Sequence, residues 1–277
     1  MLFQKYYQIN SYRFAISTSI QDIAEELNLL FSPLTADPGP VETEFSIVQT
    51  STDSETTYSL FEGKNLITKS DNIDKLLEEL EWTATLRILE NLSDFVQIHA
   101  SGVVLDDGAL LIPGPPGSGK TLLVLSFLLK GFSCLSDEII FIHPQSLKAY
   151  PFPRSFHIER EAVNILPELK KYISSHPYLD SSGKVRLNPE AIRKNWLAEP
   201  AMPRWIIFPE YNQENSDQLI PIGKTHAISL LVNQAINLAD YGAGGIDVLV
   251  DLVQKCDCYI FRAKSVHSSS VLVERLR

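Results

Sequence analysis

The sequence predicts an α/β protein, on three observations. Strand-like apolar runs alternate with helical patterns, a glycine-rich loop joins one such run to a helix, and the composition is that of a globular chain. The chain has 277 residues, of which 44% are hydrophobic and 21% charged. Because this length exceeds one average domain, we expect a smaller N-terminal α/β module over residues 1–94 and a larger domain over residues 95–277.

Charge and cysteine content narrow the environment and the partners. The net charge of −10 argues against general binding to nucleic acid or to a membrane surface, although a local basic groove stays compatible with it. The cysteines are odd in number, and Cys256 and Cys258 have no second pair that would complete a zinc site. No charged and apolar leader opens the chain, and no apolar run approaches the ~20 residues that cross a bilayer. We therefore expect reduced thiols, a cytoplasmic location, and neither nucleic acid nor membrane as a partner.

The N-terminal module is expected to hold short strands and two helices. A long helix at its end, capped by Ser70 or Asp71, is interpreted as a bridge to the larger domain, with docking of a substrate as the alternative. The expected elements are a strand or hairpin over 6–18, a helix over 20–30 stopped by Pro33, a loop over 35–40, strands over 45–50, 57–61 and 65–69, and the helix over 73–92.

The larger domain begins with a strand over 96–105 and a second strand over 109–112 that leads into a glycine-rich loop. The helix after the loop is expected to run to Lys130. Glycines at both ends let the backbone curl until its N–H groups point inward, and the helix N-terminus favours an anion. Lys120 supplies a cation for the β- and γ-phosphates, and the Thr121 hydroxyl suits Mg²⁺. An ordinary glycine and proline turn is the alternative. The nucleotide-binding residues are predicted to be Gly114, Pro115, Pro116, Gly117, Ser118, Gly119, Lys120, Thr121 and Leu122.

Two adjacent carboxylates, Asp137 and Glu138, stand between strand-like runs that end at Leu135 and resume over 139–142. Burying such charges is costly unless they are paired or hold a cation. Beside a phosphate loop, one acid can hold Mg²⁺ while the other accepts the proton of an attacking hydroxyl. A solvated turn is the alternative. His99 is expected on the strand next to the one that leads into the glycine-rich loop. There it could serve either as a packed core residue or as a catalytic residue.

The rest of the chain, from residue 148 onward, has weaker sequence patterns. Arg154, Arg160 and Lys184 are candidates to steady phosphate charge, against ordinary surface positions. The glycine break over 242–245 follows a helix and so is not a dinucleotide fingerprint. The expected elements are strands over 148–152 and 154–158, helical or loop segments over 159–178, a mobile loop over 180–184, a buried strand over 203–209 with its loop over 210–217, helices over 225–239 and 246–254, a strand over 258–261, and a closing helix over 265–277.

Three segments together resemble the HPr kinase/phosphorylase superfamily, and within it the HPr-kinase-related kinases. They are Ile98-His99-Ala100-Ser101-Gly102-Val103-Val104, the loop over 114–121, and Leu135-Ser136-Asp137-Glu138. A weaker similarity continues through the strand over 203–209 and through Asn233-Gln234-Ala235-Ile236-Asn237. The resemblance covers roughly residues 95 to 262 and is more specific in its first three segments.

The resemblance implies an HPr-kinase-like catalytic domain over 95–277, with a P-loop core similar to that of phosphoenolpyruvate carboxykinase. It implies ATP and Mg²⁺ on the loop, Asp137 as general base, Glu138 at the neighbouring acidic position, and His99 as the strand histidine. HPr kinases typically carry two aspartates where this chain has Asp137-Glu138, and the chain lacks a Glu-Val-Arg-Gly segment. Phosphorylase activity and HPr itself are therefore not implied. Some related kinases occur in biosynthetic clusters for modified peptides, including lasso peptides, where a small peptide is the phosphate acceptor, and others have no assigned substrate.

The sequence thus predicts a serine-type kinase that acts on a peptide or protein and uses ATP and Mg²⁺. Asp137, His99 and Lys120 are its predicted catalytic residues, and Thr121 and Glu138 its predicted metal ligands. A kinase for a small hydroxyl compound such as free serine is one alternative, and a nucleotide sensor without transfer is the other. Family kinases are often oligomers, so a homo-oligomer is possible, but nothing in the sequence marks an interface.

Overall fold

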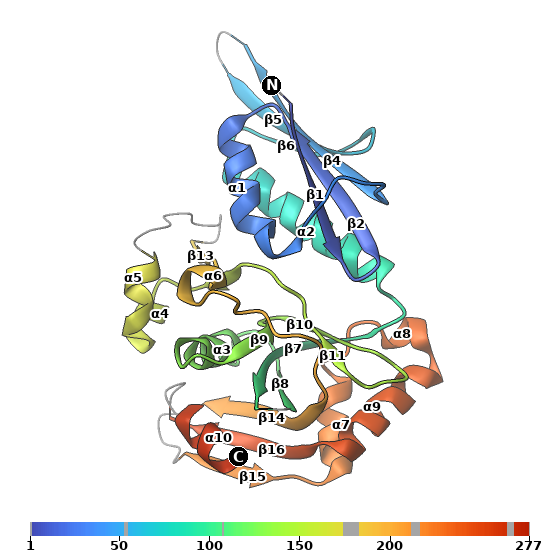
Figure 1. The fold of residues 1–277 in the computed structure, drawn as a ribbon, viewed down its shortest axis with the longest axis vertical. Coiled ribbons are helices and arrows are strands. Elements are labelled where there is room, and N and C mark those ends of the chain that lie inside the picture. The colour runs from blue at the N-terminus through green and yellow to red at the C-terminus, as the bar shows by residue number, and fades with distance from the viewer. Residues whose placement is uncertain are drawn as a thin grey trace.

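The computed structural model describes residues 2–52, 55–106, 108–173, 183–211, 217–264 and 269–276 (Figure 1). The protein is a mixed α/β structure, as expected, and most of its strands belong to two sheets. The sheet of the N-terminal module lies at one end of the long axis, and the larger sheet lies toward the other end. No helix among these residues has the length and apolarity needed to span a bilayer.

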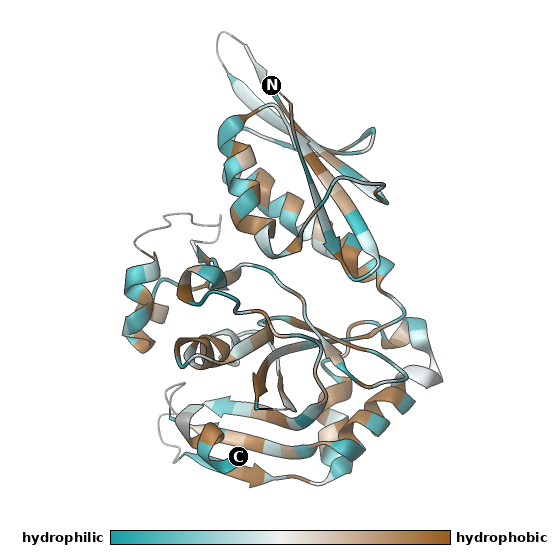
Figure 2. Cartoon of the chain, in the orientation of Figure 1, coloured by the Kyte–Doolittle hydropathy of each residue, from teal (hydrophilic) through white to brown (hydrophobic). Residues whose placement is uncertain are grey.

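The N-terminal sheet has six strands in the order β3-β1-β2-β4-β5-β6. Its pairs are antiparallel except β2 with β4, which run parallel. Two helices share one buried cluster with the sheet, and teal and brown bands alternate along α1 in Figure 2, as expected for a helix with one buried face. The elements are β1 (Phe3–Ile9), β2 (Tyr12–Thr18), α1 (Gln21–Phe31), η1 (Ser32–Leu34), β3 (Thr35–Ala36), β4 (Thr43–Ser51), β5 (Thr56–Glu62), β6 (Asn65–Ser70) and α2 (Ile73–Asn91).

The larger sheet has the order β11-β10-β7-β8-β14-β16-β15, with β9 paired to β7 as well. Its centre is parallel, because β14 runs parallel to both β8 and β16, while the remaining pairs are antiparallel. Figure 2 shows brown along β7 and β8, which are almost wholly buried. The strands are β7 (Val96–Leu105), β8 (Gly108–Pro113), β9 (Ser133–Ser136), β10 (Ile139–Ile142), β11 (Ala149–Tyr150), β14 (Pro203–Tyr211), β15 (Gln218–Pro221) and β16 (Asp257–Ala263).

Helices and one small sheet surround the larger sheet. Helix α3 follows β8 directly after the glycine-rich loop and packs in one buried cluster, while α7 and α9 belong to another. The remaining elements are α3 (Lys120–Leu129), β12 (Phe156–Ile158), α4 (Ala162–Ile165), η2 (Pro167–Leu169), α5 (Lys170–Ile173), β13 (Val185–Leu187), α6 (Pro189–Ile192), α7 (Lys224–Val232), α8 (Leu238–Tyr241), α9 (Ala243–Lys255) and α10 (Ser269–Leu276).

The two sheets are joined by buried side chains. The cluster that contains the helices and strands of the N-terminal module also contains Phe95, Ile139, Phe141 and Phe152. Phe95 packs edge-on against Phe141, with ring centroids 6.0 Å apart. The N-terminal module is therefore fixed to β10 and to the segment over 151–155 by a common core, which places α2 beside the larger sheet.

Several expected elements differ from the structure. The helix expected over 225–239 is interrupted, because residues 233–237 leave helical geometry and lie along β7. The amide of Ile236 donates to the carbonyl of Gln97 at 2.8 Å, and the amide of His99 donates to the carbonyl of Gln234 at 2.7 Å. Strand β8 ends at Pro113, so this part of β7 needs other partners for its backbone, and the segment supplies them.

Smaller differences have local causes. Strand β15 was not expected, because its four residues end in proline and lie at an edge of the sheet. Helix α9 begins at Ala243, so only Gly242 of the glycine break, at φ +56°, separates it from α8. The predicted mobile loop lies outside the described residues except for Gly183 and Lys184, and the described part of the closing helix is α10.

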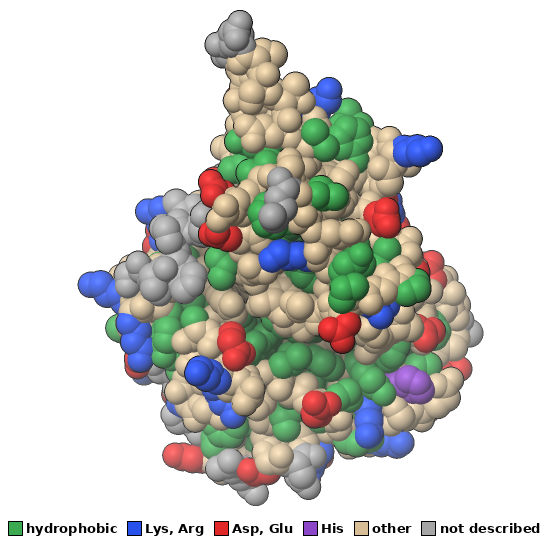
Figure 3. Space-filling view, turned by 45° about the horizontal axis from the view of Figure 1, so that its top comes forward, with side chains coloured by type: hydrophobic (Ala, Val, Ile, Leu, Met, Phe, Trp, Pro, Cys, Tyr) green, Lys and Arg blue, Asp and Glu red, His purple; other side chains and the backbone are tan. Residues whose placement is uncertain are grey.

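Charges on one face of the molecule are mixed. Figure 3 shows acidic and basic side chains in small groups between hydrophobic patches on the face that it presents. All of the cysteines are free and buried, in agreement with reduced structural thiols.

Candidate functional site

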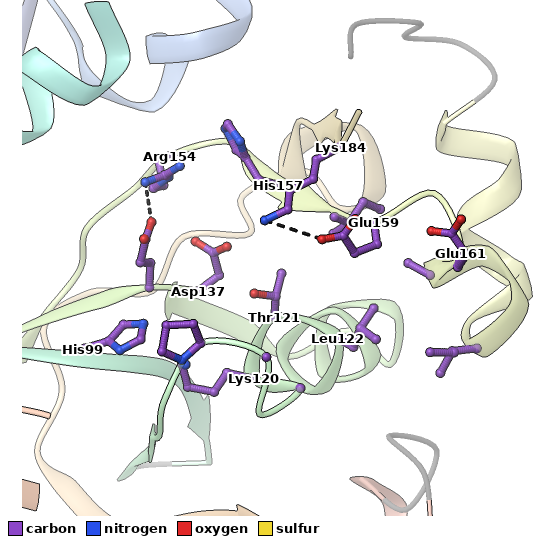
Figure 4. A pocket seen from close by; sticks show the side chains of 17 residues that line it. His99, Lys120, Thr121, Leu122, Asp137, Arg154, His157, Glu159, Glu161 and Lys184 are labelled. Carbon is purple, nitrogen blue, oxygen red and sulfur yellow. Dashed lines mark hydrogen bonds and ion pairs between the residues drawn. The ribbon is translucent and has the colours of Figure 1, made fainter. Parts of the chain in front are cut away.

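A hollow of about 580 Å³ lies beside the glycine-rich loop, and we refer to it as the loop pocket (Figure 4). Its volume is within the roughly 300–1,000 Å³ of ordinary small-molecule sites. The loop follows the carboxyl end of β8, which runs parallel to β14, and such strand ends are where open α/β sheets bind ligands. Its walls come from the loop, the start of α3, the connection between β9 and β10, and the chain around β12.

The glycine-rich loop has the backbone that a phosphate cradle needs. Gly117 and Gly119 adopt φ values of +78° and +80°, a left-handed geometry that favours glycine. A Cβ on Gly119 would lie 2.6 Å from Cε2 of Tyr211, so that position is closed by contact as well as by geometry. Helix α3 begins at Lys120, directly after Gly119. The predicted order of strand, loop and helix is therefore present, with the helix N-terminus facing the pocket.

Lys120 is folded back against its own loop. Its Nζ donates to the carbonyl oxygens of Gly114 at 2.7 Å and Pro115 at 3.0 Å. Burial lowers the pKa of Lys120 to about 8, against the opposing effect of Glu138 and Asp137. The cation of the loop therefore lies close to both acids, at the inner end of the pocket.

Asp137 occupies the tight connection between β9 and β10. The Ser101 hydroxyl donates to its carbonyl oxygen at 2.5 Å, and the Ser136 hydroxyl accepts the amides of Glu138 and Ile139 at 3.1 Å each. The Asp137 side chain is buried, and its Oδ1 has no hydrogen-bond partner among the described residues. Burial raises the pKa of this carboxyl to about 7. A carboxyl with this pKa, buried at the edge of a pocket, is suited to accept a proton at neutral pH.

Glu138 and His99 complete the side of the pocket nearest to β7. Glu138 is partly exposed and accepts a hydrogen bond from Nη1 of Arg154. His99 lies on β7 opposite Ile139, and the amide of Ala100 donates to the carbonyl of Glu138 at 3.0 Å. Burial and the charge of Lys120 lower the pKa of His99. The predicted strand histidine therefore lies beside the connection between β9 and β10 that carries the predicted acids.

A group of charges, of which the sequence singled out only Arg154, adjoins Glu138. We refer to Glu81, Arg154, His157 and Arg186 as the Glu81 cluster. Glu81 of α2 lies 3.3 Å from Nη2 of Arg154, 3.1 Å from Nε2 of His157 and 3.6 Å from Nη2 of Arg186. Burial alone would raise the pKa of Glu81, but the charges of its partners lower it to about 2. The N-terminal module thus contributes a carboxylate that pairs with Arg154, a residue that lines the loop pocket.

One signal in the sequence marks Glu81. It stands on the buried face of α2 with Leu77, Ala84 and Ile88, at helical spacing, so a carboxylate interrupts an apolar stripe. Such a residue needs a cationic partner. The sequence offers no comparable signal for Arg186 or His157, which face each other across the short strands β12 and β13.

Most of the predicted site residues line the loop pocket. The exceptions are Gly114 and Pro115, whose carbonyl groups hold Lys120 from behind, and Ser118, whose hydroxyl is buried. The predicted residues that line it are His99, Pro116, Gly117, Gly119, Lys120, Thr121, Leu122, Asp137 and Glu138.

The three candidate phosphate-steadying cations differ in position. Arg154 and Lys184 line the pocket, and Lys184 lies 3.5 Å from Glu159. Arg160 is exposed and does not line the pocket, so it occupies an ordinary surface position, which was the alternative.

The donors of the loop pocket suit a magnesium ion that is held together with phosphate. Mg²⁺ usually keeps several waters and takes one or two carboxylates with phosphate oxygens. Asp137, whose Oδ1 is unpartnered among the described residues, lines the same pocket as Thr121 and Glu138. Within the described residues, no group of three or more His, Cys, Asp or Glu side chains is arranged to hold a metal alone. The residues present therefore fit an ion that takes most of its ligands from a bound phosphate chain.

A second hollow, of about 660 Å³, opens between α2 and the larger sheet, and we refer to it as the α2 groove. It is continuous with the loop pocket, because the two share His99, Glu138, Arg154 and His157. Its other end is apolar. Trp82, Leu86 and Ile236 line it and are 60%, 36% and 46% exposed. Large hydrophobic side chains exposed together are typical of binding surfaces.

No protein-family model matches the sequence, and no curated protein matches it.

Proposed function

We propose that the protein is an ATP- and Mg²⁺-dependent kinase that transfers the γ-phosphoryl group to a serine-type hydroxyl of a peptide or protein. The observation that carries the proposal is Asp137, a buried carboxyl with one unpartnered oxygen, in the same pocket as Lys120 and Thr121. The finer architecture that we propose is a P-loop kinase core of the HPr kinase type. The sequence resemblance supports that architecture, and so does the arrangement of β8, loop and α3.

The loop would bind and neutralise the phosphate chain. Loop amides and the N-terminus of α3 favour an anion, and Lys120 would turn from its own carbonyl groups toward the β- and γ-phosphates. A bound Mg²⁺, held by Thr121 and Glu138, would neutralise charge on the transferred group. Leu122, Ile158 and Ile165 offer an apolar wall at another part of the pocket, which suits a nucleobase.

Asp137 would orient the acceptor and take its proton. In the step, the acceptor oxygen forms a bond to the γ-phosphorus, the bond between that phosphorus and the β,γ-bridging oxygen breaks, and ADP leaves. The hydroxyl proton passes to the Asp137 carboxylate. The pKa of about 7 matches this role, because a base works best when its pKa is near the working pH.

The α2 groove supports a polypeptide acceptor over free serine. It meets the loop pocket at His99 and Arg154, which lie on the side away from Leu122 (Figure 4). Its apolar end would contact side chains that flank an acceptor residue. Free serine has no such side chains and would leave the groove unused.

The test follows the γ-phosphate. The protein is incubated with Mg²⁺ and ATP labelled at the γ-position, together with a library of peptides that carry one serine in varied apolar or polar surroundings, or with free serine. We expect label in peptides. The D137N variant should lose transfer by about 10³-fold or more while its ATP Kd changes less than about threefold. The D71N variant, which alters an exposed aspartate, is the matched control.

Each other outcome has a definite meaning. Label in free serine alone would favour the small-molecule kinase, and ATP binding without any transfer would favour the nucleotide sensor. A D137N enzyme that turns over at the wild-type rate would remove Asp137 as the base.

A further inference from the structure

Arg154 stands in a segment without regular secondary structure, within which its Nε donates to the carbonyl of Ser155 at 3.3 Å. Residues 151–155 form no helix or strand, and Pro151 and Pro153 leave two of its positions without an amide donor. The side chain of Arg154 nevertheless lines both the loop pocket and the α2 groove and is only 17% exposed. Its position must therefore come from contacts with other parts of the molecule.

The N-terminal module supplies contacts on both sides of Arg154. Phe152 belongs to the buried cluster formed mainly by the N-terminal sheet and its helices. The Ser155 hydroxyl donates at 2.9 Å to the carbonyl of Leu29 on α1. The backbone that carries Arg154 is thus anchored to the N-terminal module, and also to β9, because the amide of Phe152 donates to the carbonyl of Leu135 at 3.2 Å.

The guanidinium group is held in the same way. Its Nη2 lies 3.3 Å from Oε1 of Glu81, and its Nη1 donates to Oε2 of Glu138. A guanidinium is planar and offers its donors in a fixed fork, so two carboxylates on separate elements set its orientation. One of them belongs to α2 and the other to the acid pair of the pocket.

Glu81 is well suited to this task because it stays charged. Its own side chain is 8% exposed, and His157 and Arg186 hold it from other directions. Without its charge, Arg154 would keep only Glu138 among its ion-pair partners in the described residues. The fork would then turn onto Glu138, so that the cation and the acid would neutralise each other.

We infer that Glu81 is a positioning residue for phosphoryl transfer, through which the N-terminal module holds Arg154 beside the transferred phosphoryl group. The inference rests on the proposed function and extends it to residues 1–94. Glu81 lines the α2 groove and not the loop pocket, and in this role it acts on the transferred group through Arg154. The N-terminal module is therefore part of the active site, in addition to being packed against it.

The test is a double-mutant cycle on the full chain with E81Q and R154Q. We expect E81Q to lower kcat for peptide phosphorylation by about 10- to 100-fold with less than a threefold change in the KM for ATP. Once Arg154 is gone, E81Q should have little further effect, because the two act as a unit. The E79Q variant, altered at a partly exposed position of the same helix, is the control and should match the wild type. Additive losses in kcat, or an E81Q enzyme with wild-type kcat, would overturn the inference.

Two further measurements distinguish an effect of the Glu81 substitutions on folding from an effect on turnover. E81D keeps the charge and should recover part of kcat if E81Q proves too unstable to assay, whereas an E81D enzyme as inactive as R154Q at wild-type stability would contradict positioning by charge. The side-chain N–H signals of Arg154 in a ¹⁵N spectrum, identified by their loss in R154Q, should shift in E81D and not in E79Q. This readout needs no turnover, so a wild type that transfers nothing would refute the proposed function while the spectra still test the inference.

Discussion

Lys120 and Arg154 face the same pocket but are held in opposite ways. Lys120 bonds to carbonyl groups of its own loop, five and six positions away along the chain. Arg154 pairs with a carboxylate of α2, while its neighbours Phe152 and Ser155 contact a shared core and a carbonyl of α1. The hydrogen bonds of Lys120 are local and can break when a ligand binds. The position of Arg154 depends on the docking of two sheets, so that in the proposed kinase the catalytic activity and the tertiary stability would both depend on its contacts. Four predictions, in order of expected effect, test this contrast.

The largest effect is expected at Lys120. In K120A, transfer should fall by about 10³-fold, because a preorganised cation beside developing negative charge is lost. The free energy of unfolding should change by less than about 1 kcal/mol, because the loop does not support the core. Phosphate transfer and urea unfolding measure the two quantities, and K64A, in an exposed turn, is the control. A large loss of stability would show that the local arrangement also supports the fold.

The next effect is the pH dependence of the stability that Glu81 contributes. Its pKa is lowered to about 2, so its stabilisation is complete above its ordinary pKa and disappears as pH falls through about 2. At pH 7 we expect E81Q to unfold more easily by about 3 kcal/mol, at 1.36 kcal/mol for each pKa unit. The difference should shrink between pH 4.5 and pH 2.

Urea unfolding of E81Q, E79Q and the wild type across this pH range measures the effect. A difference between E81Q and the wild type that stays constant with pH would mean that the charge of Glu81 is not what stabilises the junction.

The third effect compares two glycines of the loop. Alanine at either position meets a positive φ, which costs about 1–2 kcal/mol. G119A should lose more stability and more nucleotide affinity than G117A, because its Cβ would lie 2.6 Å from Tyr211 whereas nothing lies within 4 Å of the other. Thermal unfolding and nucleotide titration of the two variants give the comparison. Equal losses would show that contact with Tyr211 is not limiting.

The smallest effect is expected in the α2 groove. W82A should raise the KM for an apolar-flanked serine peptide about fivefold, equivalent to about 1 kcal/mol. Its stability should change by less than about 0.5 kcal/mol, because Trp82 is 60% exposed. L66A, which removes a hydrophobic side chain that is 49% exposed on β6, is the control. An unchanged KM would place the acceptor elsewhere.

The parts of the site that could be predicted from the sequence are those in which neighbours along the chain are neighbours in space. The loop, the helix after it, and the acid pair at the end of a strand are of this kind. The position of His99 beside Asp137 and Glu138 required only that two predicted strands pair, and they do. Helix α2 was predicted within one residue at its C-terminal end.

The rest depends on contacts between distant segments. His157 and Glu81 are 76 positions apart, and their pairing follows from how α2 docks. Arg186 lies on a strand of three residues, too short for a periodic pattern. The helix break over 233–237 arises because β7 needs backbone partners there, a demand that the apolar spacing of 225–239 does not show.

The break over 233–237 affects how fast the backbone amides of β7 exchange with solvent. The amides of Gln97 and His99 are closed off by the side chain of Asn237, at 2.9 Å, and the carbonyl of Gln234, at 2.7 Å. Their exchange with deuterium therefore requires residues 233–237 to lift from β7 or a larger opening to occur. Slow exchange at these two amides would show that residues 233–237 stay bound to β7. Selective loss of protection at the two amides would give the rate at which this segment separates from the strand.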